Sequence, residues 1–86
     1  MTDAKHTGLP VKGYQSQSAK NVDLVNANKV LEEIILRNLD DFEKMSEVDK
    51  RWLAVARTHV EQGFMAMNRA IFKPGRITLP EDGAPE

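Results

Sequence analysis

Residues 51–72, with the sequence RWLAVARTHVEQGFMAMNRAIF, constrain the fold more than any other part of the chain. Apolar residues recur there every three or four positions, which is the spacing of one face of an α-helix. A first stripe consists of Leu53, Ala56, Val60, Phe64, Met67 and Ile71. An adjacent second stripe consists of Trp52, His59, Gly63, Ala66 and Ala70, which are mostly small. One neighbouring helix can cover only the first stripe, so the pattern predicts a helix with two contact surfaces.

A second helical pattern covers about residues 21–45, and no proline or glycine interrupts it. Its apolar positions are Leu24, Leu31, Ile35, Leu39 and Phe42, widened by Ala27, Val30 and Ile34. Their spacing is again that of a helix with one broad apolar face. Either Asn21 or Asp23 could cap the start of this helix, because both side chains can accept a hydrogen bond from a backbone amide in the first turn.

Residues 46–49 predict a break and then a new helix over about residues 49–72. They form a loose variant of the capping box, in which Ser46 is followed by Asp49 where Glu or Gln is preferred. Pro74 and Gly75 then end the second helix. Two helices of roughly 24 residues with a short link predict an all-α fold, namely an antiparallel two-helix hairpin over residues 13–75.

The two ends of the chain lack this periodicity. Gly8, Pro10 and Gly13 punctuate the N-terminal part, so residues 1–12 are predicted to form a flexible arm, extended as far as the first helix. Residues 76–86 contain two prolines, a glycine and three acidic residues, and are predicted to form a flexible tail.

The second stripe predicts assembly into a symmetric homo-oligomer. A chain of 86 residues buries a modest core, and an uncovered apolar stripe of this kind usually marks an interface. A monomer whose arm folds over the second stripe is the alternative. Gly63, unfavourable in mid-helix, indicates either close packing against another backbone or close approach of a ligand.

Composition excludes several classes of function. The chain has no cysteine, and His6 and His59 lack metal-ligand spacing, so neither a metal nor a cofactor is expected. With 12 basic and 13 acidic residues, the net charge of −1 argues against binding of long nucleic acid, although a small anion could still bind. No apolar run is long enough to span a membrane, and the start lacks a signal-peptide core. The cytosol is therefore the expected location.

Catalysis is not expected. No nucleophile has a recognisable Ser-His-Asp context, and no phosphate-binding glycine loop is present. Asp40 and Asp41 are adjacent and point to different sides of a helix. His59 lies among small apolar residues, where an interface histidine is the favoured interpretation over a catalytic base.

Binding is the more plausible activity, and Tyr14 and Lys29 are the first candidates. Tyr14 is the only tyrosine, in a glycine-bounded arm. An exposed aromatic ring there could stack on a nucleobase, or it could anchor the arm to the helices. Lys29, near Asn26 and Asn28, could bind a phosphate or a purine acceptor, or it could lie on a solvated face.

A further face of the second helix carries polar residues, namely Arg51, Thr58, Gln62 and Arg69. In a monomer these side chains would simply be solvated. In an oligomer, copies of Arg69 or Arg51 could converge around a symmetry axis and bind several phosphates.

Several strings in the sequence resemble a known family. RWLAVARTH at residues 51–59, QGFMA at residues 62–66, and Arg69-Ala70 followed by Pro74 resemble the helical hairpin domain of phage anti-CBASS sponge proteins. Phage proteins that block Thoeris immunity share this hairpin. The similarity covers about residues 13–75, and Gly13-Tyr14 and the Asn-Ala-Asn-Lys stretch at residues 26–29 look like further family elements.

The resemblance implies sequestration rather than catalysis. Such proteins are compact hexamers that bind cyclic oligonucleotide immune messengers in the infected cell without degrading them. Cyclic dinucleotides such as 3′,3′-cGAMP are expected in pockets between paired protomers, where Tyr14 stacks on a base and Lys29 makes polar contacts. The residues accompanying them are Gly13, Asn26 and Asn28. A separate pocket near a three-fold axis is expected to bind cyclic trinucleotides, with Arg69 as the first candidate and Thr58 as the second.

Two alternatives stay open at this point. One is a small oligomeric protein-interaction module without a nucleotide ligand, in which Tyr14 is only an anchor. The other is a sponge for cyclic ADP-ribose isomers.

Overall fold

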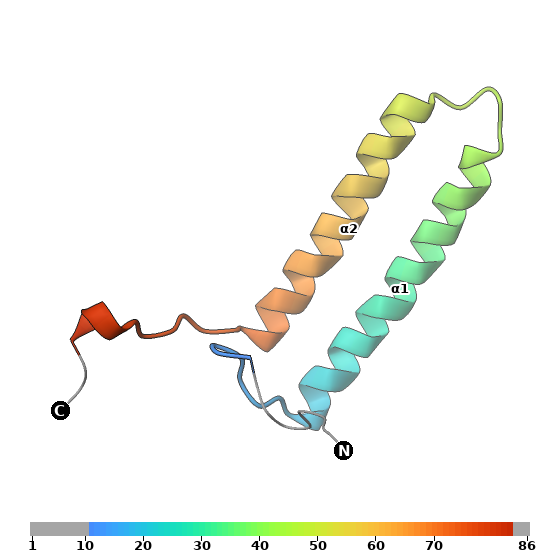
Figure 1. Ribbon diagram of the computed structural model, residues 1–86. Coiled ribbons are helices and arrows are strands. Elements are labelled where there is room, and N and C mark those ends of the chain that lie inside the picture. Colours follow the sequence, from blue (N-terminus) through green and yellow to red (C-terminus); the bar gives the residue numbers. More distant parts are fainter. Residues whose placement is uncertain (1–10, 84–86) are drawn as a thin grey trace, which may run out of the picture.

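The computed structural model describes residues 11–83, and these form an α-helical hairpin (Figure 1). Helix α1 spans Ala19–Glu43 and helix α2 spans Lys50–Phe72. The two helices run antiparallel, and a short 3-10 helix, η1, follows at Pro80–Asp82. No strand occurs between residues 11 and 83. The predicted all-α hairpin is confirmed, whereas its assembly into a hexamer stays a prediction.

Most of the predicted arm and the last three residues of the predicted tail lie outside this description. Residues 1–10 of the predicted arm and residues 84–86 of the predicted tail are not among the described residues. Neither helix in the described part is long and apolar enough to cross a membrane.

Helix α1 begins earlier than expected, because Ser18 caps it instead of Asn21 or Asp23. The Ser18 hydroxyl accepts a hydrogen bond from the backbone amide of Asn21 at 3.1 Å. At the other end, the amides of Lys44 and Met45 bond to carbonyls three residues back, at 3.1 and 3.0 Å. This tighter turn ends the helix at Glu43, before the predicted end near residue 45.

The predicted capping box that opens at Ser46 is wrong, because Asp49 is the N-cap of α2. Its carboxylate accepts hydrogen bonds from the amides of Arg51 and Trp52, at 2.9 and 3.2 Å. The carboxylate also places negative charge at the positive end of the helix dipole. Asp49 thus has the role that the sequence analysis gave to Ser46.

The core between the helices is small. Among the described residues, the buried apolar side chains are Val25 and Leu39 of α1 and Leu53 of α2. Polar pairs fix the register: the Asn28 amide donates to the Asn68 side-chain oxygen at 3.0 Å, and Arg57 pairs with Asp40 at 2.9 Å. The first stripe of α2 faces this seam, although Met67 remains 44 % exposed.

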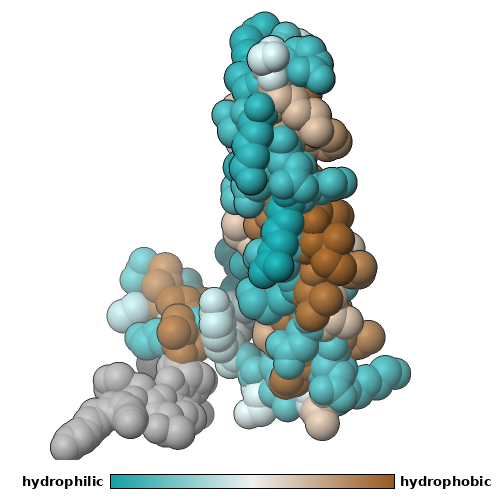
Figure 2. Space-filling view, turned by 90° about the vertical axis from the view of Figure 1, so that its right-hand side faces the viewer, coloured by the Kyte–Doolittle hydropathy of each residue, from teal (hydrophilic) through white to brown (hydrophobic). Residues whose placement is uncertain are grey.

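The hairpin leaves much apolar surface uncovered. All five members of the second stripe of α2 are exposed, including Trp52 at 62 %. On α1, Val30, Leu31 and Ile34 are also exposed, and Figure 2 shows an apolar patch midway along the hairpin. A Cβ built on Gly63 would meet no described atom within 4 Å apart from its own helix backbone, so no other segment of residues 11–83 packs closely on it. These surfaces support the predicted assembly of several copies.

We expect Asp49→Ala to destabilise the protein by about 1 kcal/mol, because two amides of the first turn of α2 lose their acceptor. Urea denaturation followed by circular dichroism, at one fixed protein concentration, measures the loss. Ser46→Ala is the matched control and should change stability by no more than a few tenths of that amount. A larger loss in Ser46→Ala than in Asp49→Ala would contradict the assignment.

Candidate functional site

The described residues that precede α1, residues 11–18, are called the arm from here on. Two glycines fasten this arm to the chain just beyond α2. The amide of Gly75 donates a hydrogen bond to the carbonyl oxygen of Gly13. Gly13 has φ 86°, and a Cβ built on it would overlap the carbonyl oxygen of Gly75. Only glycine satisfies both requirements without strain. We call this contact the glycine clasp, and Tyr14 follows it directly.

A glutamine side chain secures the arm at a second point. The Gln17 amide donates to the backbone carbonyl of Phe72 at 2.8 Å and to that of Gln15 at 3.0 Å. Phe72 is the last residue of α2, where helix carbonyls lack partners within the helix. The side-chain oxygen of Gln17 in turn accepts a bond from Asn21 at 3.3 Å. The arm is therefore tied to the end of α2 and to the start of α1.

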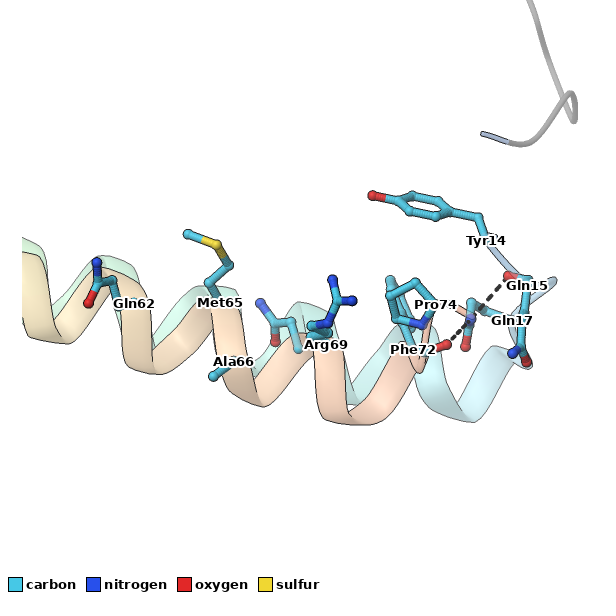
Figure 3. Close-up of a pocket in the computed structure, with 10 residues that line it drawn as sticks. Tyr14, Gln15, Gln17, Gln62, Met65, Ala66, Arg69, Phe72 and Pro74 are labelled. Atoms are coloured by element: carbon cyan, nitrogen blue, oxygen red, sulfur yellow. Dashed lines mark hydrogen bonds between the residues drawn. The ribbon is translucent and has the colours of Figure 1, made fainter. Parts of the chain in front are cut away.

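Between the arm and α2 lies a cavity of about 610 Å³, which we call the Tyr14 cavity. Its arm side consists of Tyr14, Gln15 and Gln17. Its other side consists of Gln62, Met65, Ala66, Asn68, Arg69, Phe72 and Pro74. Figure 3 shows the Tyr14 ring standing apart from the α2 side chains, with open space between them. The volume is in the range of small-molecule sites, and Tyr14 is 63 % exposed, so its ring is accessible for stacking.

The electrostatics of the Tyr14 cavity favour an anion. Arg69 is the one charged residue among the described residues that line it. Within residues 11–83 its guanidinium makes no ion pair. The remaining polar groups are amides and the Tyr14 hydroxyl, which are neutral donors and acceptors. A planar, negatively charged ligand therefore fits the aromatic ring and the cation together.

Lys29 lies in a different and smaller pocket, of about 380 Å³, on α1. This pocket is lined by Lys29, Val30, Glu33, Ile34 and Arg37. Arg37 pairs with Glu33 at 2.8 Å, and this hydrogen bond raises the pKa of Arg37. Because that pair is neutral overall, Lys29 supplies the net positive charge of the pocket.

The other predicted site residues are spread over the hairpin. Asn28 is engaged in the interhelical bond to Asn68, and Asn26 is exposed and lines neither cavity. Thr58 also lines neither, and its hydroxyl donates to the carbonyl of Ala54 at 3.2 Å. Within one chain, Tyr14 and Arg69 line the same cavity, although the sequence predicted that they bind separate ligands. Lys29 does not line this cavity.

Several lining residues were missed from the sequence. Gln15, Gln17 and Asn68 were not identified, and Phe72 was considered only as the end of a helix. Met65 and Pro74 were noted in the family resemblance but not as site residues. The contact that creates the cavity joins Gln17 to Phe72 across 55 positions. Only the unpaired carbonyls at a helix end could have indicated that something must bind there.

Comparison with protein families decides the identity. A family model described as Acb2/Tad1, hairpin domain, matches residues 8–72. The chain belongs to this family. It is the family of anti-CBASS and anti-Thoeris sponges, so the resemblance found in the sequence is confirmed. Comparisons with curated proteins and with solved structures give no match.

Membership implies a phage anti-defence protein that binds cyclic oligonucleotides. Sponges of this family bind their ligands rather than degrade them. The match includes Tyr14, Lys29 and Arg69, whereas the segment from residue 73 onward lies beyond it. The family alone does not distinguish a CBASS messenger from a cyclic ADP-ribose isomer.

We expect Gly13→Ala to open the glycine clasp, because the new methyl group overlaps the Gly75 carbonyl. Hydrogen exchange measured by NMR should then show faster exchange of the Gly75 amide, together with weaker ligand binding through Tyr14. Gly83→Ala is the matched control, since Gly83 also has positive φ but has open space around its Cβ position. Unchanged exchange at Gly75 in Gly13→Ala would show that the clasp does not hold the arm.

Proposed function

We propose that copies of this chain form a homohexamer that sequesters cyclic dinucleotides such as 3′,3′-cGAMP in the host-cell cytoplasm. Removal of the messenger keeps CBASS effectors inactive. The observation that carries the proposal is the Tyr14 cavity, in which an exposed aromatic ring faces a surface whose single charge is Arg69. Stacking and phosphate contacts are the two interactions that a cyclic oligonucleotide offers.

A cyclic dinucleotide has two bases and two phosphates, whereas one chain offers one Tyr14 ring. Two symmetry-related copies would supply two rings, one for each base. Since Lys29 does not line the Tyr14 cavity of its own chain, a second copy is proposed to supply it. This arrangement explains why binding and assembly belong together in this protein. Gly13 holds Tyr14 in place through the glycine clasp. Asn28, next to Lys29, fixes the register of the helices through its bond to Asn68.

Cyclic trinucleotides are the second proposed ligand class. Three copies of Arg69 around a three-fold axis would match three phosphates, and the guanidinium is free for this within residues 11–83. Thr58 is the weaker candidate, because its hydroxyl already donates to a helix carbonyl. Asn26 is exposed and could contact either ligand.

A preference for cyclic ADP-ribose isomers is the alternative, because the matched domain is shared by anti-CBASS and anti-Thoeris sponges and does not distinguish their ligands. Such ligands also present an adenine ring and phosphates, so the same cavity could hold them. Ligand competition distinguishes the two.

We expect the protein to bind 3′,3′-cGAMP tightly and to return it intact. The protein is incubated with the ligand, separated from free ligand by gel filtration, and denatured by heat. Chromatography of the released material should then recover cyclic GMP-AMP in full. A parallel experiment offers the protein a mixture of 3′,3′-cGAMP and a cyclic ADP-ribose isomer. Absence of binding, or preferential capture of the cyclic ADP-ribose isomer, would reject the proposed ligand. Recovery of a linear product would indicate an enzyme.

We expect Tyr14→Ala to weaken 3′,3′-cGAMP binding about tenfold or more, because stacking on an aromatic ring contributes roughly 1–3 kcal/mol per base. Tyr14→Phe keeps the ring and should bind nearly as well as wild type. Lys29→Ala should also weaken binding about tenfold through loss of a charged hydrogen bond, whereas Lys44→Ala, at the far end of α1, should not. Isothermal titration calorimetry measures affinity, and light scattering checks that the oligomer is intact. Normal binding by both Tyr14→Ala and Lys29→Ala would refute the site assignment.

A further inference from the structure

The segment that follows the glycine clasp, residues 76–82, leaves the hairpin, and we call it the strap. Figure 1 shows it running from the end of α2 toward the side opposite α1. Within residues 11–83 its hydrogen bonds are internal: the amide of Leu79 donates to the Asp82 carboxylate at 2.8 Å, and the amide of Asp82 donates to the Leu79 carbonyl at 3.0 Å. The strap thus keeps its shape without hydrogen bonds to either helix.

The strap carries two exposed apolar side chains, Ile77 at 46 % and Leu79 at 44 %. The backbone of Leu79 is extended, with φ −100° and ψ 157°. Side chains along an extended backbone alternate between its two sides. Ile77 and Leu79 are therefore expected on one side, about 7 Å apart, with Thr78 on the other. Water contact on the apolar side is unfavourable, so this side favours a partner surface.

An exposed apolar face of α1 has the matching spacing. Val30 and Ile34 are 60 % and 59 % exposed and lie about 6 Å apart, one helical turn from each other. Together with Lys29 they line the 380 Å³ pocket on α1. Because the strap leaves on the side opposite α1 (Figure 1), it does not cover this face of its own chain. The face is available to the strap of a second copy.

The charges next to both surfaces favour one direction of docking. Lys29 precedes Val30, and Glu81 follows Leu79 by two positions. Within residues 11–83, neither Lys29 nor Glu81 makes an ion pair. With Leu79 on Val30, Glu81 comes to Lys29, so opposite charges meet. In the reverse direction Glu81 would approach Arg37, whose charge is already paired.

The glycine clasp connects the strap to the ligand site. The Cγ2 atom of Ile77 lies 3.5 Å from the position of a Cβ built on Gly13, the residue before Tyr14. A second copy that brings Lys29 to the Tyr14 cavity therefore also brings the neighbouring face of its α1 toward the strap. The two contacts are compatible, because the Lys29 ammonium has three donors and can bind a carboxylate and a phosphate together.

We propose that the strap of one chain docks on α1 of a second copy, with Leu79 on Val30, Ile77 on Ile34 and Glu81 opposite Lys29. The inference rests on the proposed function, in which a second copy supplies Lys29. It also gives a role to a segment that lies beyond the family match, which ends at residue 72. The strap would hold the second copy in the position from which Lys29 reaches the ligand.

Disulfide crosslinking tests the contact directly, because the chain has no cysteine of its own. Leu79→Cys and Val30→Cys chains, distinguished by tags of different size, are coexpressed and oxidised with copper phenanthroline. We expect a disulfide-linked heterodimer on a non-reducing gel. Leu79→Cys with Met45→Cys is the control, since Met45 is exposed beyond the far end of α1. Absence of the heterodimer, or an equal yield in the control, overturns the inference.

We also expect Leu79→Asp to raise the concentration at which assembly is half complete by about tenfold or more, because a carboxylate would be pressed against Val30. Val30→Asp should do the same from the other side of the contact. Both side chains are exposed in the single chain, so the hairpin itself should fold. Thr78→Asp adds the same charge to the other side of the strap and should leave assembly unchanged. Light scattering over a dilution series measures this, and unchanged assembly in either Leu79→Asp or Val30→Asp overturns the inference.

Titration with 3′,3′-cGAMP separates this inference from the proposed function. Loss of affinity in Leu79→Asp, but not in Thr78→Asp, supports both. A Leu79–Val30 crosslink in a protein whose wild type binds no cyclic dinucleotide leaves the docking standing and overturns the proposed function. Tight binding by wild type without the crosslink overturns the docking alone.

Discussion

The attachment of the N-terminal arm to the end of α2 is the interaction on which the candidate site depends. Gly13 and Gly75 join through their backbones, and Gln17 satisfies the terminal carbonyl of Phe72. Helix ends must find partners for such carbonyls in any case. Here the partner comes from the arm, so one contact both satisfies the last carbonyl of the helix and holds Tyr14 beside α2. Without it, the ring would be an isolated aromatic on a free chain, and the cavity would have only one wall.

A second constraint is the small core. The three apolar side chains that are buried within residues 11–83 cannot offset the conformational entropy of ordering two long helices. The exposed apolar stripe of α2, with Trp52 at one end, and the exposed residues of α1 offer the burial that is missing. Assembly would therefore supply stability as well as proximity. In such a protein, a ligand placed between copies stabilises the same contacts that hold the fold together.

The helices could be predicted from the sequence because their signals are local. Apolar spacing and the Pro74-Gly75 stop are readable within a few turns. The caps were harder, because Ser18 and Asp49 compete with equally suitable residues three to five positions away, and only the path of the chain decides among them. Tyr14 and Arg69 were recognised as candidates, but their common cavity was not. It depends on a hydrogen bond between positions 55 residues apart, for which the sequence has no periodic signal.

The distribution of charge explains how such a site can select a small ligand. Long nucleic acid binds through many phosphates at once and needs an extended basic surface. This chain has a net charge of −1 and places one cation among neutral amides in the Tyr14 cavity. A polyanion gains little from a single arginine, whereas a compact ligand can use the arginine, the ring and the amides together. Since these groups come from both ends of the chain, the cavity exists only in the folded hairpin, and each bound ligand must shift the folding equilibrium toward the state that holds it.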